Sequence, residues 1–458
     1  MPRTRSRIWR RLAALALALA VVMYLLPYDN HIRLTIRYYV YTSRQLPLSR
    51  KEMLAEPAPH AVDLATDVAL IVKSGYGTKN RIPGMLASIE DTQNGSSNRM
   101  HYGSILLVAD FATKAGQHYN CCHGMNLAVH DAVAHTIARA PLGNDNKLRP
   151  VHVENYARLQ DALSAGNETL ALAVSKDVGW KLDAMKFISS LELAYTAYPD
   201  KRWYILADDD TYLVRPSLRR FLGQFCSDDA HYLGNAVGGW EARFAHGGSG
   251  VLLSQGAMRR LFRDRPTVVT QMHYEALTTG LGDSLLSYAM MLVGVYVAEQ
   301  HSVFFSGETP ATTKIRPDRF CLPILSFHGL RAVNATLDVD RVLGGDTMDR
   351  PTLWQDVWRL YGGPELGPPG FPLLRKDWDY VGRLDERTTT IDKVDDAQAC
   401  LIHCVDGKHQ AACLAWTWDA SRRVCYLSPW MIVGQDAAGR TTGLNLRRVQ
   451  QMVRDCGS

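Results

Sequence analysis

The chain has 458 residues, of which 47% are hydrophobic and 21% are charged, so it is long enough for two or three domains with a large core. Its formal net charge is +5. Arginines close to the N-terminus alone supply that charge: Arg3, Arg5, Arg7, Arg10 and Arg11. The remainder is balanced, and nothing in the composition indicates a nucleic-acid partner.

The arginines lead directly into residues 12–26, an apolar segment without charge. It is shorter than the usual span of about 20 residues, but Trp9 and Tyr28 are suited to the two membrane interfaces. The basic flank predicts a cytoplasmic tail over residues 1–11, a signal anchor over residues 12–28 and a lumenal remainder, as in a single-pass type II membrane protein. A cleaved signal peptide is the alternative. Short spans favour early secretory membranes, so we expect the Golgi.

Glycosylation sequons also favour a lumenal location. The Asn-x-Ser/Thr pattern of N-glycosylation acceptors occurs at Asn94, Asn167 and Asn334. A chain of this length contains one or two such patterns by chance, so they add to the location argument without deciding it.

Cysteine spacing indicates an oxidising compartment. Four of the nine cysteines crowd together near the C-terminus: Cys400, Cys404, Cys413 and Cys425. In the secretory pathway this pattern is typical of a disulfide framework. A zinc site is the alternative, although paired C-x-x-C elements are lacking. The pairing of Cys121, Cys122, Cys226 and Cys321 is left open, and Cys456 is a candidate for cross-linking a homodimer.

The pattern of apolar runs predicts the domain layout. Residues 29–61 are mixed, mostly polar and without a clear period, so we expect a stem. From residue 62 onward, strand-like runs at residues 67–73 and 104–109 alternate with helical patterns such as residues 180–198. This alternation predicts an α/β domain with a mostly parallel sheet covered by helices. We place that domain at residues 62–360, followed by a Pro/Gly linker at 361–376 and a small module at 377–458.

Residues 202–213 (RWYILADDDTYL) form the stretch with the clearest chemistry, an apolar strand that ends in Asp208, Asp209 and Asp210. Three adjacent carboxylates repel one another, and ligands bind at the carboxyl end of strands in open α/β sheets. A divalent cation held there by one or two carboxylates can bridge to a diphosphate. The alternative is an acidic turn that caps the next helix.

Segments in the same order as in glycosyltransferase family 31 accompany the triplet. Besides residues 202–213, they are residues 180–187, which resemble the helix before the motif, the GGSG segment at 247–250, Gly282-Asp283 in place of an acidic pair, and Ser326-Phe327-His328. The chain therefore resembles the Fringe and core 1 β1,3-galactosyltransferase group over about residues 66–345. The resemblance implies a GT-A fold, a UDP-sugar donor and Mn²⁺ or another divalent cation.

The resemblance also implies roles for individual residues. Asp210 and His328 correspond to the metal ligands, a donor set that Mn²⁺ accepts. Asp208 would face the ribose or a metal-bound water, and Asp209 belongs to the same nucleotide-sugar site. Lys73, followed by a glycine-containing loop, lies where the fold receives the nucleotide; a surface turn with a solvated lysine is the alternative.

The acceptor hydroxyl needs a base, and Asp283 is the candidate. Its other role would be to cap the apolar helix that follows it. Because the family's acidic pair is Gly-Asp here, Glu275 and Glu241 stay open as substitutes. One base and a single displacement would invert the anomeric carbon, which the resemblance implies.

The sugar-binding part of the site is predicted from the glycine-rich segment. Gly247 and Gly248 would form the floor below the sugar. Trp240 and Phe244 are candidates for stacking on a pyranose, although aromatic residues of this kind are more often core residues.

The C-terminal segment resembles a PAN/Apple module. The matching elements are A-C-x-x-x-C at 399–404, C-L-A-W-T-W at 413–418, C-Y-L at 425–427 and Gly443. The resemblance implies disulfides Cys400–Cys425 and Cys404–Cys413. Modules of this kind bind proteins or glycans; the alternative is a stabilising appendage.

Two functions follow. The first is a metal-dependent inverting glycosyltransferase that transfers galactose or N-acetylglucosamine from a UDP-sugar to a glycan or glycoprotein acceptor in β1,3 linkage. The second is a non-catalytic lumenal glycan-binding protein or chaperone that keeps the fold. The intact Asp triplet favours the enzyme.

Overall fold

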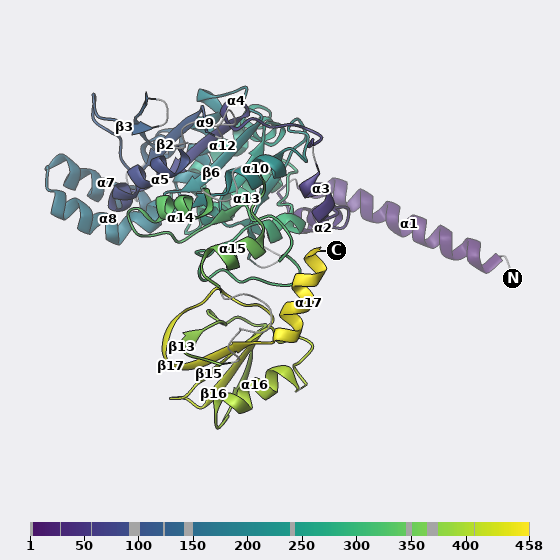
Figure 1. The fold of residues 1–458 in the computed structure, drawn as a ribbon. Coiled ribbons are helices and arrows are strands. Elements are labelled where there is room, and N and C mark those ends of the chain that lie inside the picture. The colour runs from purple at the N-terminus through teal and green to yellow at the C-terminus, as the bar shows by residue number, and fades with distance from the viewer. Residues whose placement is uncertain are drawn as a thin grey trace.

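The computed structural model describes residues 3–27, 29–55, 57–90, 101–121, 124–141, 150–238, 243–344, 350–363, 374–406 and 408–457. A six-stranded sheet in the order β5-β2-β1-β6-β11-β8 lies at its centre (Figure 1). Strands β5, β2, β1 and β6 are parallel, and β11 is antiparallel to both neighbours, so the sheet is mixed and mostly parallel, as predicted. The strands are β1 (Val68–Lys73), β2 (Ile105–Ala109), β5 (Val129–Asp131), β6 (Trp203–Asp208), β8 (Tyr232–Gly234) and β11 (Val251–Ser254).

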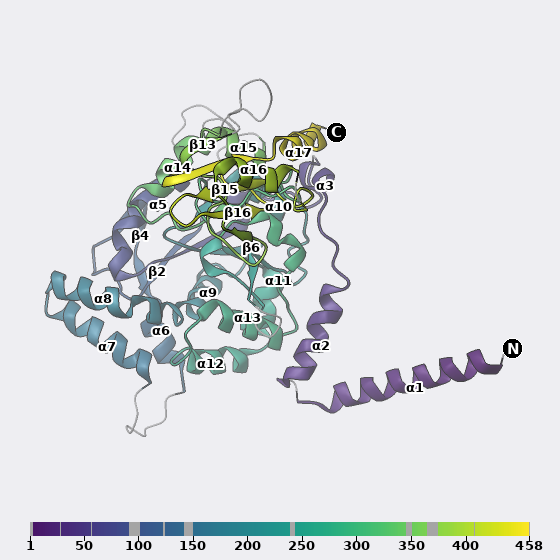
Figure 2. The same ribbon diagram turned by 90° about the horizontal axis from the view of Figure 1, so that it is seen from below.

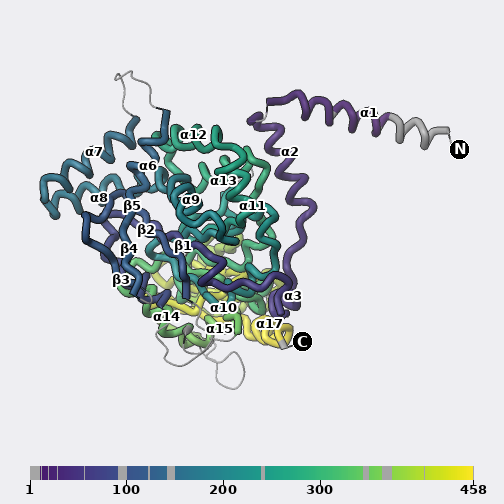
Figure 3. Tube along the Cα trace, turned by 90° about the horizontal axis from the view of Figure 1, so that it is seen from above, coloured from purple at the N-terminus to yellow at the C-terminus, as the bar shows by residue number. Residues whose placement is uncertain are grey.

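Helices enclose this sheet. All six residues of β1 are buried, as are the first five of β6, because parallel strands are covered on both faces. Figures 2 and 3 show α6, α9, α12 and α13 on one side of the sheet and α5, α10 and α14 on the other. These helices are α5 (Ile82–Ile89), α6 (Ala132–Arg139), α9 (Lys186–Ala197), α10 (Arg215–Leu222), α12 (Pro266–Glu275), α13 (Gly282–Leu292) and α14 (Ala335–Gly344).

Two further helices, α7 (Val151–Ser164) and α8 (Glu168–Asp183), pack against each other at one edge of the domain (Figure 1). The sequence pattern predicted one helix over residues 180–198, and this was wrong in one respect. The chain breaks between α8 and α9, at Ala184 and Met185. Asp183 and Lys186 lie on either side of the break, with their charged atoms 3.4 Å apart.

Short elements complete the domain. Three short strand pairs, β12 with β7, β10 with β9 and β3 with β4, are antiparallel. The short elements are α4 (Leu64–Asp67), α11 (Gln255–Met258), α15 (Trp354–Leu360), β3 (Tyr119–Cys121), β4 (Met125–Leu127), β7 (Tyr212–Leu213), β9 (Ala236–Val237), β10 (Phe244–Ala245), β12 (Ser326–Phe327), η1 (Tyr76–Arg81), η4 (Gly247–Ser249), η5 (Arg259–Arg263) and η6 (Glu299–Phe304).

The segment predicted as a stem contains regular structure. It forms α2 (His31–Thr42) and α3 (Arg50–Leu54). Leu34 and Tyr38 of α2 are buried against the domain, and Tyr38 Oη donates a hydrogen bond of 2.7 Å to Glu299. The sequence analysis did not predict α2, because it found no clear hydrophobic period there. Only a few apolar residues at helical spacing, within a polar sequence, hold this helix in place.

The N-terminal helix α1 (Arg3–Leu25) projects away from the rest of the molecule (Figure 1). Its apolar residues Leu15, Leu17 and Leu25 are exposed. Across the described residues, no helix has both the length and the apolar character that a membrane span requires. The predicted signal anchor over residues 12–28 is therefore not supported by the structure.

The C-terminal module is an α+β unit, as predicted, with a five-stranded antiparallel sheet in the order β13-β17-β15-β16-β14. Its elements are β13 (Arg375–Asp379), β14 (Thr389–Asp392), α16 (Ala397–Val405), β15 (Ala415–Asp419), β16 (Val424–Ser428), β17 (Gln435–Leu444) and α17 (Leu446–Gly457). Most of the predicted Pro/Gly linker, residues 364–373, lies outside the described residues. The module and the first domain share one buried cluster, in which Phe320 and Trp354 lie with Tyr380 and Met431.

Three disulfides hold this part of the chain together. Cys400–Cys425 and Cys404–Cys413 are the two pairs that the PAN/Apple resemblance implied. The third, Cys321–Cys456, joins the module to the first domain across 135 residues. The proposal that Cys456 cross-links a homodimer was wrong for this structure, because the terminal helix α17 folds back and places its thiol beside Cys321.

Candidate active site

A cavity of about 810 Å³ lies at the carboxyl end of β1 and β6. The structure brings together in its wall every site residue predicted within the described residues: Lys73, Asp208, Asp209, Asp210, Phe244, Gly247, Gly248, Asp283 and His328. Trp240 and Glu241 lie outside the described residues. Glu275 is not part of the wall; it lies at the end of α12 and accepts a hydrogen bond from Gln271.

Lys73 is the last residue of β1 and is only 4% exposed. Its Nζ lies 2.6 Å from Asp183 and 2.8 Å from Asp208, its register neighbour on β6. Although burial alone would lower the pKa of Lys73, the two carboxylates raise it above its ordinary value, so the lysine is charged. The sequence offered a solvated surface lysine as the alternative, and the buried ion pairs exclude it.

Asp209 supports the loop after β1. Its Oδ2 accepts hydrogen bonds of 2.6 Å from both Ser74 Oγ and Thr78 Oγ1, and its Oδ1 lies 3.2 Å from Arg81. Burial raises the pKa of Asp209. Asp209 is 5% and Asp210 8% exposed, because hydroxyl and guanidinium groups of the loop replace solvent around them.

Asp208, Asp210 and His328 form a group of side chains that could hold a metal ion. One ligand atom from each lies within 4.8 Å of the others. His328 Nε2 is 3.3 Å from Asp210 Oδ1, and His328 Nδ1 contacts the carbonyl of Gly307 at 3.4 Å. The contact at Nδ1 turns Nε2 toward the carboxylates, which is the usual orientation of a metal-binding histidine.

The charges of His328 and Asp210 influence each other's pKa. Burial would lower the pKa of His328, but its hydrogen bond and charge interaction with Asp210 raise it. Burial would likewise raise the pKa of Asp210, and the partners His328 and Arg81 lower it instead. Asp210 is therefore a carboxylate, held in place by His328 and Arg81.

His328 reaches this position through strand pairing. In β12, Phe327 pairs with Tyr212 of β7, just after the triplet. Two side-chain hydrogen bonds fix the glycine-rich segment between them: Thr211 Oγ1 donates to the carbonyl of Gly248, and Ser326 Oγ donates to that of Ser249. Residues more than 100 positions apart thus meet at one point.

Asp283 lies in the first turn of α13, which begins at Gly282. Its Oδ1 accepts from the backbone N–H of Ser284 at 2.9 Å and its Oδ2 from that of Gly247 at 3.1 Å. Burial raises the pKa of this carboxyl group. It holds the helix start and the glycine-rich segment in place while it lines the cavity.

The structure adds charged residues that the sequence reasoning did not assign to the site: Arg81, Asp110, Asp183, Lys186 and Arg331. Lys186 Nζ donates to the carbonyl of Ser74 at 2.7 Å and lies 3.7 Å from Asp110. Asp110 directly follows β2, so the rule that ligands bind at the carboxyl ends of strands could have indicated it. No pattern of this kind in the sequence indicates that Arg81 and Arg331 belong to the cavity.

His246 is a further residue of the wall. Its Nδ1 lies 2.9 Å from Ser249 Oγ, and its ring packs edge-on against His328 at 5.2 Å between centroids. Burial lowers the pKa of His246, so it is a neutral polar group beside the candidate metal ligands.

The predicted glycosylation acceptors differ in what the structure describes. Asn167 and Asn334 are exposed. Asn167 also caps α8, with Oδ1 accepting from Leu170 N–H at 3.0 Å. Asn94 lies outside the described residues.

Comparison with known proteins agrees with this geometry. Residues 180–303 match the family model described as Fringe-like. The match indicates a glycosyltransferase domain of the family 31 type, and it contains the Asp triplet, the glycine-rich segment and Asp283. Lys73 and His328 lie outside the matched segment. No curated protein sequence matches the chain.

Gly248 gives a direct test of the candidate metal site. A Cβ at this position would lie 2.2 Å from His328 Nε2, so Gly248→Ala must displace the histidine. We expect Gly248→Ala to weaken Mn²⁺ binding at least about tenfold, the lower limit for disturbing a metal ligand's surroundings, as measured by calorimetric titration.

Gly280→Ala is the matched control, since Gly280 also lines the cavity and a Cβ there meets nothing within 4 Å. Equal Mn²⁺ affinity in the two alanine variants would contradict a ligand role for His328.

Proposed function

We propose that this protein is a metal-dependent inverting glycosyltransferase that transfers galactose or N-acetylglucosamine from a UDP-sugar to a glycan or glycoprotein acceptor in β1,3 linkage. The observation that carries the proposal is the convergence of Asp208, Asp210 and His328 in the same cavity as Asp283. The Fringe-like match and the resemblance to family 31 support the same reaction class.

The charge balance of the cavity is compatible with a bound cation. The wall holds six carboxylates and five basic side chains: Asp110, Asp183, Asp208, Asp209, Asp210 and Asp283, with Lys73, Arg81, Lys176, Lys186 and Arg331. One negative charge remains if all of them are ionised, and carboxylate with imidazole is a donor set that Mn²⁺ accepts. When bound, the cation would offset the negative charge of the departing diphosphate.

Protein groups are suited to hold the rest of the donor. The loop after β1 contributes Gly75 and Thr78 to the cavity wall, and Lys186 is held against it through the carbonyl of Ser74. A glycine at position 75 lets a nucleotide approach the backbone closely. We assign this loop and Lys73 to the nucleotide, and Gly247 with Phe244 to the sugar.

Asp283 is the proposed base. It would accept the proton of the acceptor hydroxyl as the hydroxyl oxygen bonds to the anomeric carbon and the bond to UDP breaks. A carboxylate whose pKa is raised by burial accepts a proton more readily than an exposed one. Its hydrogen bonds to Gly247 and Ser284 hold it in one orientation for this step.

The proposed compartment is the Golgi lumen. The three disulfides require oxidising conditions for their formation. Exposed sequons at Asn167 and Asn334 agree with passage through the secretory pathway. We propose that the C-terminal module positions the glycan or glycoprotein acceptor.

The function is tested by assaying a panel of nucleotide sugars with purified protein, Mn²⁺ and a mixture of glycan acceptors. We expect UDP release from one UDP-sugar, lost when a chelator removes the cation. Absence of release from every donor, together with absence of UDP binding, would instead favour the non-catalytic glycan-binding alternative.

Asp283→Asn tests the base. The amide keeps the size of the side chain but cannot accept the proton, so we expect turnover to fall about 10²–10⁴-fold while donor binding is retained. In the wild type, activity should decline as pH falls through the raised pKa of Asp283, so the acid limb lies above the ordinary aspartate value of about 3.9. Initial rates of wild type and Asp283→Asn across a pH series measure both the loss of turnover and the position of the acid limb.

Asp318→Asn, at an exposed aspartate paired with Arg316, is the matched control and should retain wild-type rates. If Asp283→Asn turned over normally, the base would have to be another residue.

A further inference from the structure

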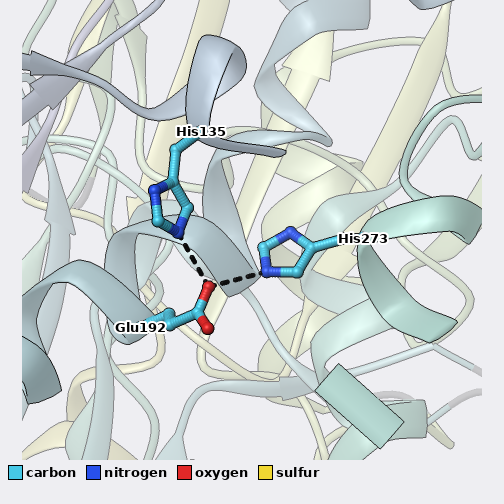
Figure 4. A group of neighbouring side chains, drawn as sticks. All are labelled: His135, Glu192 and His273. Carbon is cyan, nitrogen blue, oxygen red and sulfur yellow. Dashed lines mark hydrogen bonds and ion pairs between the residues drawn. The ribbon is translucent and has the colours of Figure 1, made fainter. Parts of the chain in front are cut away.

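A second group of potential metal ligands lies outside the cavity, between three helices. His135 of α6, Glu192 of α9 and His273 of α12 point toward one another (Figure 4). The Nε2 atoms of both histidines lie 2.8 Å from the same carboxylate oxygen, Glu192 Oε2. None of these residues belongs to the wall of the cavity or to the proposed reaction.

We infer that His135, Glu192 and His273 form a zinc site that ties α6, α9 and α12 together. Two imidazoles and one carboxylate are a donor set that Zn²⁺ binds in proteins. The cavity cluster, with two carboxylates and one imidazole, is by contrast better suited to Mn²⁺. The chain thus has two sites with different metal preferences.

The surroundings of Glu192 support a cation at this place. Arg139 Nη2 donates to Glu192 Oε1 at 2.7 Å, which leaves Oε2 directed at the histidines. Glu192 Oε2 is therefore the atom that both imidazole nitrogens contact, as a metal ion shared by the three side chains requires.

The distances from Glu192 Oε2 to the two histidine nitrogens fit a zinc ion that replaces the protons of these two hydrogen bonds. Ligands of a tetrahedral zinc with bonds of about 2.0–2.1 Å lie about 3.3 Å apart, so each N···O distance must lengthen by roughly half an ångström. The side chains differ in exposure: His273 is fully buried, Glu192 is 14% exposed and His135 is 27% exposed. The exposed side at His135 would let the ion enter from solvent and would let a water molecule be its fourth ligand.

The zinc would stabilise the helix that supports the cavity. Six positions before Glu192, α9 begins with Lys186, which holds the loop after β1. Phe187 on the same helix lies against Gly247 and Gly282. Fixing α9 between α6 and α12 therefore fixes one wall of the cavity without contributing a group to it.

The test uses the full-length, untagged protein after treatment with chelator. We expect wild-type protein to bind one more zinc equivalent than His135→Gln or Glu192→Gln, measured by titration and metal analysis of the dialysed protein. Loss of a residue that hydrogen-bonds to a metal ligand weakens metal binding roughly 10–100-fold, so Arg139→Gln should weaken zinc binding within that range. Loss of a ligand itself, in His135→Gln or Glu192→Gln, should weaken it by more. Co²⁺ should give the visible absorption of a tetrahedral site in the wild type but not in His135→Gln or Glu192→Gln.

His130→Gln is the matched control, because His130 is exposed on β5 and outside the cluster. Zinc should raise the melting temperature of the wild type and of His130→Gln but not of His135→Gln. Equal zinc stoichiometry in wild type, His135→Gln and Glu192→Gln, all folded by circular dichroism, would overturn the proposal and leave a hydrogen-bonded triad.

Discussion

The pairing of buried charges at the ends of β1 and β6 determines how the rest of the site is built. Lys73 is almost completely buried between Asp183 and Asp208, and a buried charge without a partner would cost several kcal/mol. Lys186, at the start of α9, lies close to Asp183 and Asp110 in the same place. The same requirement explains how Asp209 and Asp210 can be buried, because each has a protein partner.

The same constraint separates the roles of the three aspartates. Asp209 is occupied by hydroxyls and Arg81, and it holds the loop on which a nucleotide would rest. Asp208 and Asp210 keep oxygen atoms close to His328. β6 ends at Asp208, and Asp209 and Asp210 lie in the turn that follows it. This strand end therefore supplies loop support from Asp209 and candidate metal ligands from Asp208 and Asp210.

Much of the fold was predictable because buried strands leave a strong signal. The apolar runs ending at Lys73, Ala109 and Asp208 became β1, β2 and β6. The disulfide pairs of the module followed from the PAN/Apple resemblance, because cysteine spacing alone leaves three connectivities open. The helix α2 was missed because its stability comes from tertiary contacts and not from its own pattern.

Roles within the site were harder to predict. The order of motifs placed Asp210, Asp283 and His328 in one cavity, since a resemblance carries long-range information that local patterns lack. Arg81 and Lys186 were not assigned because their function depends on which carboxylates the fold brings near them. The cross-link between Cys321 and Cys456 depends likewise on the docking of α17, which spacing along the chain does not encode.

The central claim is that a divalent cation held by Asp210 and His328 binds the diphosphate of the donor. The most direct measurement is calorimetric titration of UDP into the wild type and Asp210→Asn, with Mn²⁺ and with chelator, using Asp161→Asn on the exposed face of α7 as control. The account predicts Mn²⁺-dependent UDP binding in the wild type and Asp161→Asn that is lost in Asp210→Asn. UDP binding of equal strength in Asp210→Asn, or binding indifferent to chelator, would contradict it.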